Sequence, residues 1–281
     1  MKAGRALLQI HIAVFFFGIA GLFGKFVAVP AMMIVLGRAF FASIAIGVGL
    51  LLFRQSVKLG NAQNYAALLG LGAILALHWW SFFYAIQVST VAVGLVTFST
   101  FPVFTALLEP LYFKEPFRTR PLLLAALTFF GVVLVVPEYR WENQIFQGAV
   151  WGVVSGFTFS ILSILNRAYV RRYSSFVIAF YQDLGASLVL LPLLLWTDVS
   201  VSPTDFWLLV LLGVVFTALS HGLFINGLRS VNAASASIIG SLEPVYGIVG
   251  ALLLLGEVPS MRTIVGGLII LGVSVVVSVK N

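Results

Sequence analysis

The chain has 281 residues, of which 61% are hydrophobic and only 9% are charged, and its formal net charge is +7. A soluble domain carries about a quarter charged residues, so this composition excludes an ordinary soluble protein and indicates an integral membrane protein. The chain contains no cysteine, which excludes disulfides and cysteine-ligated metals. Because the basic residues are scattered through short connections, we relate the positive charge to the membrane and expect no nucleic-acid partner.

Hydropathy divides the chain into ten apolar segments, and a transmembrane helix needs about 20 apolar residues. The first segment follows Lys2 and Arg5 as a signal peptide would, but it is longer than a typical signal-peptide core and no convincing cleavage site follows it. We therefore interpret it as the first transmembrane helix and expect an all-α integral membrane protein. The ten predicted helices are residues 6–29, 31–53, 64–87, 91–113, 121–137, 147–170, 175–197, 204–228, 232–255 and 261–279.

The positions of the basic residues predict the orientation, because cytoplasmic connections carry an excess of lysine and arginine. With the N-terminus in the cytoplasm, twelve of the sixteen basic residues lie on the cytoplasmic side. We therefore expect a multi-pass protein of the cell (inner) membrane with both termini in the cytoplasm. The twelve residues are Lys2, Arg5, Arg54, Lys58, Lys114, Arg118, Arg120, Arg167, Arg171, Arg172, Arg229 and Lys280.

The two halves of the chain repeat each other. Six residues recur as the same residue exactly one repeat later, at a constant separation of 142 positions without a gap. Five helices per half would place the second copy upside down in the membrane, as in many secondary transporters. We therefore predict two inverted five-helix repeats, residues 1–140 and 141–281, around a central cavity. The recurring residues of the first copy are Ser99, Pro102, Val103, Leu111, Glu115 and Arg120.

These motifs resemble the EamA family of the drug/metabolite transporter superfamily over nearly the whole chain. The second copy reads Ser241-Leu242-Glu243-Pro244-Val245 and then Leu255-Gly256-Glu257, which matches the family pattern closely. The first copy reads Ser99-Thr100-Phe101-Pro102-Val103 and then Phe113-Lys114-Glu115, so Lys114 replaces the usual glycine. The segment from His78 to Ala85 is similar to the third span of such proteins, and Arg38 stands where the family often has an arginine.

The resemblance implies a carrier in which spans 1–4 and 6–9 surround the cavity. Members of the family move amino acids, other small metabolites, nucleotide sugars or toxic organic compounds, and the bacterial members are often exporters coupled to protons. The resemblance therefore implies a transporter without naming its cargo.

Glu243 is the sharpest candidate among the polar residues inside the membrane, where an ionisable group costs several kcal/mol unless it is paired or hydrated. It is predicted near the middle of the ninth span, directly before Pro244, and it corresponds to Phe101 in the first repeat. We expect Glu243 to bind substrate and to exchange the coupling proton. The alternative is a structural glutamate that joins two helices through a hydrogen bond.

The remaining candidates lie on several spans. We expect the substrate to contact His78, Trp79, Ser99, Phe101, Gln182, His221, Tyr246 and Arg38, and we expect Asp183 and Lys25 to act at the gates. Each has a structural alternative, since a lone histidine is more often a core residue and a buried arginine must meet a carboxylate, helix carbonyls or an anionic substrate group.

The sequence predicts a transporter of small molecules rather than an enzyme. It contains no Walker loop, no catalytic motif and no metal-ligand cluster, so we expect no cofactor and no metal. The leading prediction is a secondary active exporter of amino acids or related amphiphilic compounds, working as a monomer or homodimer among membrane lipids. The alternatives are an importer or exchanger of a nucleotide sugar or organic cation, a channel, an intramembrane enzyme and a lipid scramblase.

Overall fold

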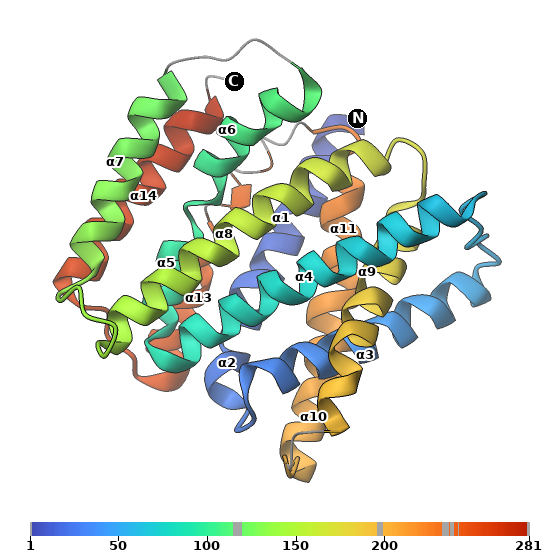
Figure 1. The fold of residues 1–281 in the computed structure, drawn as a ribbon, viewed down its shortest axis with the longest axis horizontal. Coiled ribbons are helices and arrows are strands. Elements are labelled where there is room, and N and C mark those ends of the chain that lie inside the picture. Colours follow the sequence, from blue (N-terminus) through green and yellow to red (C-terminus); the bar gives the residue numbers. More distant parts are fainter. Residues whose placement is uncertain are drawn as a thin grey trace.

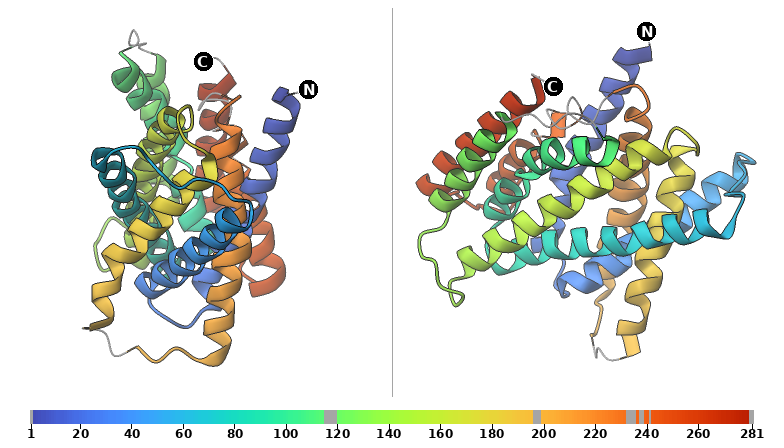
Figure 2. Two further views of the ribbon diagram at one scale, coloured as in Figure 1. Left: turned by 90° about the vertical axis from the view of Figure 1, so that its right-hand side faces the viewer. Right: turned by 45° about the horizontal axis from the view of Figure 1, so that its top comes forward.

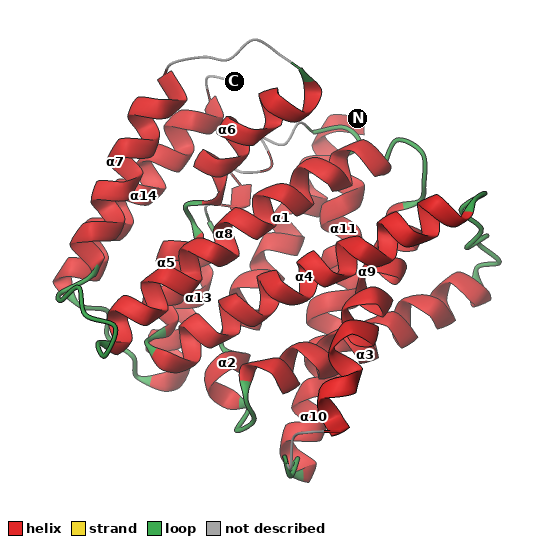
Figure 3. Ribbon diagram, viewed as in Figure 1, coloured by secondary structure: helices red, strands yellow, loops and turns green. Residues whose placement is uncertain are grey.

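The computed structural model describes residues 2–114, 120–195, 199–231, 236, 239–240 and 242–279. This part of the chain consists of helices joined by loops and contains no strand (Figure 3). The protein is therefore all-helical, as predicted. Its helices in chain order are α1 (Lys2–Gly21), α2 (Phe23–Phe26), α3 (Ala31–Leu52), α4 (Ala62–Val88), α5 (Val91–Phe98), α6 (Phe101–Phe113), α7 (Arg120–Val135), α8 (Gln144–Tyr169), α9 (Ser175–Leu190), η1 (Leu191–Leu195), α10 (Pro203–Leu211), η2 (Leu212–Leu219), α11 (Ser220–Gly227), α13 (Glu243–Leu255) and α14 (Met261–Val279).

Seven segments of the described chain are long and apolar enough to cross a membrane, which identifies a multi-pass membrane protein. Three shorter apolar helices, Leu123–Val135, Glu243–Leu255 and Met261–Val273, lie in the ranges predicted for the fifth, ninth and tenth spans. The number of spans stays a prediction. The seven long segments are Gly4–Phe26, Ala31–Leu52, Ala62–Val88, Val91–Phe113, Gln144–Tyr169, Ser175–Leu195 and Pro203–Gly227.

The helices form one bundle with a peripheral pair. Helices α4 and α8 cross in front of α1 and α11 in Figure 1, and α4 also packs on α9. Helices α7 and α14 pack on each other at one edge of the bundle, away from α3, α9 and α11 (Figures 1 and 2). The start of α1 and the end of α14 lie at the same end of the bundle in every view.

Several predicted helices are interrupted or end early. The predicted helix 6–29 comprises α1, which ends at Gly21, and α2, which ends at Phe26. Val27 after α2 is extended, and Val29 precedes Pro30, where a residue before proline avoids the helical conformation. The seventh predicted helix changes to a 3-10 helix at Leu191, next to Pro192. The eighth contains a π-helix, η2, between α10 and α11. Residues 196–197 of the seventh range lie outside the described residues.

The predicted helix 91–113 is two helices, although Val91–Phe113 as a whole is one of the segments long and apolar enough to cross a membrane. Helix α5 ends at Phe98 and α6 begins at Phe101, with Pro102 in its first turn, where the missing N–H of proline costs no hydrogen bond. Helix α13 begins at Glu243, again with proline second, and like α6 it has 13 residues. Of the predicted helix 232–255, residues 232–235, 237–238 and 241 lie outside the described residues, as does Glu115 of the repeat motif.

Both of these helices end at a residue in the left-handed conformation. Lys114 after α6 has φ 57°, and Gly256 after α13 has φ 66°. Glycine adopts this conformation without steric cost, whereas a residue with a Cβ atom is strained there. Lys114 of the first copy corresponds to Gly256 of the second copy. It therefore occupies a position where glycine is physically favoured.

A stripe of glycines brings α8 close to its neighbours. A Cβ atom added to Gly148, Gly152 or Gly156 would lie 2.1 Å from Ser89 Oγ, 1.9 Å from Thr97 Oγ1 and 2.7 Å from the carbonyl oxygen of Phe98. Small residues on one stripe let helix backbones approach each other in lipid. The stripe therefore lets α8 pack closely on α5 and the end of α4.

Candidate functional site

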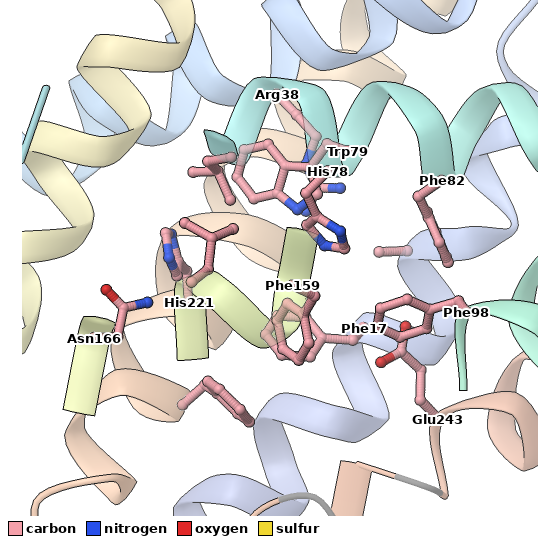
Figure 4. Close-up of a pocket in the computed structure, with 14 residues that line it drawn as sticks. Phe17, Arg38, His78, Trp79, Phe82, Phe98, Phe159, Asn166, His221 and Glu243 are labelled. Atoms are coloured by element: carbon pink, nitrogen blue, oxygen red, sulfur yellow. The ribbon is translucent and has the colours of Figure 1, made fainter. Parts of the chain in front are cut away.

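A buried cavity lies at the centre of the bundle, and both halves of the chain line it (Figure 4). It brings together five of the predicted site residues: Arg38 of α3, His78 and Trp79 of α4, His221 of α11 and Glu243 of α13. Aromatic rings cover much of the remaining wall. We call this space the central cavity, and its other lining residues are Phe17, Ala20, Leu75, Phe82, Phe98, Phe159, Leu162, Asn166 and Phe224.

Arg38 is a buried charge held by neutral partners. Its side chain is 3% exposed, its Nε donates a hydrogen bond to Thr217 Oγ1 at 3.1 Å, and its Cζ lies 3.8 Å from the ring centre of Trp79. A guanidinium over an aromatic face gains a cation–π attraction. Within the described chain no carboxylate forms an ion pair with Arg38, so the salt bridge considered from the sequence is absent there.

Asp183 and His221 form a buried pair beside the cavity. The Asp183 side chain is fully buried on α9, and its Oδ1 lies 3.4 Å from His221 Nδ1. These facing atoms have no hydrogen-bond partner among the residues that the structure describes. The edge of the His221 ring also meets Trp79, with ring centres 5.9 Å apart. Asp183 does not line the cavity, whereas His221 does.

Gln182 reaches the cavity only through a neighbour. Its Nε2 donates a hydrogen bond to Asn166 Oδ1 at 2.6 Å, and Asn166 of α8 lines the cavity. Asn166 is not among the residues predicted from the sequence, although an amide inside an apolar segment indicates a candidate polar site. Phe159 and Thr217 are not among them either, since no sequence signal distinguishes a cavity residue from any other apolar or hydroxyl residue of the helices.

His78 is tied to α8 at the cavity wall. Its Nδ1 lies 3.1 Å from the carbonyl oxygen and 2.9 Å from the Oγ of Ser155, and Ser155 Oγ also lies 3.2 Å from the carbonyl oxygen of His78. Its ring packs against Phe82, Phe98 and Phe159. The contacts to Ser155 hold one ring nitrogen, so His78 both joins α4 to α8 and faces the cavity.

Glu243 is a buried carboxylate at the first position of α13. It is 6% exposed and lines the central cavity. Within the described part of the chain its carboxylate has no hydrogen-bond or ion-pair partner. The helix start is packed directly on α1, since a Cβ atom at Gly18 would lie 2.8 Å from the Glu243 carbonyl oxygen. The structural alternative of a glutamate joining two helices by a side-chain hydrogen bond finds no partner in that part.

Three other predicted residues lie near the cavity without lining it. Ser99 Oγ donates a hydrogen bond to the Leu95 carbonyl at 2.9 Å. The Phe101 ring is buried behind Phe98, with ring centres 5.1 Å apart. Tyr246 packs on α1 at the edge of the Phe15 ring, at 5.4 Å.

Lys25 lies at a connection between helices rather than in the cavity. Its Nζ donates hydrogen bonds to the carbonyl oxygens of Ser89, at 3.0 Å, and Gln87, at 3.3 Å. Glu257, from the other half of the chain, accepts hydrogen bonds from the backbone N–H groups of Val91 and Ala92. We call residues 87–92 the α4–α5 junction. It is held by one cation and one anion from outside its own helices.

Comparison with known proteins places the chain in a family. The sequence model of the EamA-like transporter family matches residues 4–136 and again residues 146–279. An uncharacterized transporter of Archaeoglobus fulgidus is 31% identical over 73% of this chain and 73% of its own length. The pseudopaline exporter of Pseudomonas aeruginosa is 28% identical over 86% of this chain and 84% of its own. The S-adenosylmethionine uptake transporter of Rickettsia conorii is 23% identical over 83% and 78%.

The fold also has a counterpart among solved structures. One crystal structure superposes with a TM-score of 0.70 over 97% of this chain and 94% of its own, at 16% sequence identity. An identity this low shows a shared fold alone. The family match covers nearly the whole chain and agrees with the motifs around Pro102 and Pro244. The chain is therefore a member of the EamA-like transporter family, within the drug/metabolite transporter superfamily.

Proposed function

We propose that the protein is a secondary active transporter that exports amino acids or related amphiphilic compounds by alternating access. The observation that carries the proposal is the central cavity, which is buried, lined by helices of both halves, and has charged groups of both signs on aromatic walls. Few precisely placed polar groups on an apolar wall are typical of small-molecule sites. One relative is named an exporter and another an uptake transporter, so export rests on the resemblance.

We further propose ten transmembrane helices in two inverted repeats, residues 1–140 and 141–281, with both termini in the cytoplasm of the inner membrane. Helices α6 and α13 support this arrangement, because they have the same length, start 142 positions apart and both carry proline as their second residue. So does the position of the start of α1 and the end of α14 at one end of the bundle (Figure 2). The transporter works as a monomer or a homodimer.

In this proposal Arg38, His78, Trp79, His221 and Glu243 contact the cargo. Phe101 and Gln182 act from behind the cavity, through Phe98 and Asn166. Asp183 belongs to a gate through its contact with His221, and Lys25 to a gate at the α4–α5 junction. Ser99 and Tyr246 remain predicted substrate contacts in another state of the cycle.

Proton coupling is assigned to Glu243. A carboxylate that faces the cavity without a partner in the described chain is able to exchange a proton with whatever enters. Protons from outside would neutralise Glu243 and allow the cavity to reopen inward, and cargo loading inside would displace the proton. The same group is then used alternately by the proton and by the cargo, which couples the two fluxes.

The test is a transport screen in proteoliposomes with an imposed pH gradient. The panel contains amino acids, their amides, the corresponding amines, nucleotide sugars and quaternary ammonium compounds. We expect gradient-driven accumulation of at least one compound, abolished by a protonophore. Movement of lipid between leaflets, or conversion of a compound into a product, without accumulation of any compound would favour a scramblase or an enzyme instead.

A further inference from the structure

The central cavity carries opposite charges at separate places. Figure 4 shows Arg38 and Glu243 on opposite sides of the cavity, with the His78 ring between them in this view. Both side chains are buried, at 3% and 6% exposure, and both line the cavity. A buried charge is costly unless something pairs with it. Each of the two charged groups therefore needs a partner of opposite charge.

Arg38 has hydrogen-bonding capacity to spare. A guanidinium has five N–H donors in a planar fork, and only Nε of Arg38 has a hydrogen-bond partner among the described residues, namely Thr217. The ring face of Trp79 at 3.8 Å, together with Thr217, fixes the plane of the guanidinium. The two Nη groups are therefore a positioned fork at the cavity wall, a geometry that matches a carboxylate in a bidentate manner.

Asp183 does not occupy this fork. Asp183 contacts His221 and lies outside the cavity lining, and the described chain places no carboxylate within ion-pair distance of Arg38. His221 Nδ1 faces Asp183 Oδ1 at 3.4 Å, so Arg38 is the basic side chain at this end of the cavity that is left for an anionic cargo. One cation suits a monoanion such as a carboxylate better than a doubly charged phosphate.

Glu243 has the complementary chemistry. An ionised carboxylate only accepts hydrogen bonds, and a primary ammonium group supplies three donors and a positive charge. The Phe98 ring lies beside Glu243 in Figure 4, and Phe17, Phe159 and Phe224 also line the cavity. The wall between the two charged groups is thus aromatic, and it suits an apolar side chain.

We propose that the cargo is a zwitterion with a free carboxylate and a free amine, bound with the carboxylate at Arg38 and the amine at Glu243. Thr217 acts as a positioning residue for Arg38. The proposal rests on the proposed transport function and narrows it to a substrate class. Compounds that lack either charged group leave a buried charge of the cavity unpaired and are rejected for that reason.

The wild-type protein tests this without mutation. In proteoliposomes, counterflow is measured for an amino acid of the screening panel, its carboxamide and its decarboxylated amine, which share one side chain. We expect the amide and the amine to be transported at least on the order of tenfold more slowly, because each loses a charge-assisted interaction. If either analogue is transported as fast as the amino acid, or if only non-zwitterionic compounds are transported, the substrate class is overturned and the transport function stands. Movement of no compound at all overturns both.

Single variants then test which residue binds the carboxylate of the cargo and which binds its amine. Arg38→Gln should reduce the preference for the amino acid over its amide to near unity, while Arg140→Gln, at an exposed arginine of a connection, keeps it. Thr217→Val retains Arg38 and removes its Nε partner, so it should lower the preference for the amino acid over its amide by a smaller factor. This variant tests Arg38 even if Arg38→Gln fails to fold. Glu243→Gln should lower the preference for the amino acid over its N-acetyl derivative. If Thr217→Val keeps the amino acid/amide preference and Glu243→Gln keeps the amino acid/N-acetyl preference, the assignment of the carboxylate to Arg38 and of the amine to Glu243 is overturned.

Discussion

The carboxylate of Glu257 accepts a hydrogen bond from the backbone N–H of Val91, with Oε2 and N 3.1 Å apart, although the two residues are 166 positions apart. Its other oxygen accepts from Ala92 at 3.0 Å, so Glu257 satisfies two donors at the start of α5 that no helix bond can satisfy. The positive end of a helix also favours a negative charge. Lys25 meets the carbonyl oxygens of Ser89 and Gln87 on the other side of the same junction.

These contacts predict that Glu257 keeps the predicted outer side of the cavity closed. In the cysteine-free chain, Ala20→Cys provides a reporter on the cavity wall. Adding Glu257→Ala should increase its labelling by a membrane-impermeant thiol reagent from outside by severalfold, because the start of α5 loses its two hydrogen bonds to Glu257. The matched control is Glu142→Ala, an exposed acid on a predicted outer connection. Equal labelling in both backgrounds would show that Glu257 is not part of a gate.

Proton coupling at Glu243 predicts a separation of two activities. Glu243→Gln keeps the size of the side chain and loses the exchangeable proton, so gradient-driven accumulation should fall to background while exchange of internal for external cargo continues at a reduced rate. The measurement is uptake in liposomes with and without a pH gradient, with Glu138→Gln on a connection as the control. Undiminished accumulation in Glu243→Gln would assign coupling to another residue.

The packing of α4 predicts opposite effects for two neighbouring glycines. A Cβ atom at Gly72 would lie 2.5 Å from the Gln182 carbonyl oxygen, so Gly72→Ala should destabilise the protein by about 1–3 kcal/mol through overpacking. At Gly70 nothing lies within 4 Å, and Gly70→Ala should be neutral or stabilise the helix by up to about 1 kcal/mol. Thermal unfolding in detergent distinguishes them, and equal midpoints would contradict the close contact of α4 with α9.

The ends of α6 and α13 predict a second matched pair. Gly256→Ala should lower stability by about 1 kcal/mol, because a Cβ atom is strained at φ 66°. Lys114→Gly should leave stability unchanged or raise it, since it removes the same strain at φ 57°. Gly49→Ala, inside α3 with open space around it, controls for the general effect of removing a glycine. A lower midpoint for Lys114→Gly would contradict the strained conformation of Lys114.

The proposed topology predicts the accessibility of two positions. A cysteine at Glu142 should react with an impermeant reagent in intact cells, and one at Arg171 should react only after the membrane is opened. Both positions are exposed on connections of the structure. The opposite pattern would reverse the orientation, and equal reactivity of both positions from outside would contradict an α8 that crosses the membrane.

The sequence by itself determined the class of protein, the family and the approximate helices, because these depend on local properties. Composition and apolar segment length are read along the chain, and they located the described helices to within a few residues outside the interrupted ones. The proline motifs around Pro102 and Pro244 also depend only on neighbouring residues. They identified the family, but the helix starts at Phe101 and Glu243 appeared only in the structure.

Only the tertiary structure decided which candidates meet. In a membrane protein, lipid-facing and buried positions are both apolar, so hydropathy does not reveal which face of a helix points inward. Arg38 lies over Trp79 and bonds to Thr217, which is 179 positions away, while Tyr246, equally plausible from its position, turns to Phe15. Such contacts depend on how close the helices approach and how they are rotated, which the packing of the whole bundle determines.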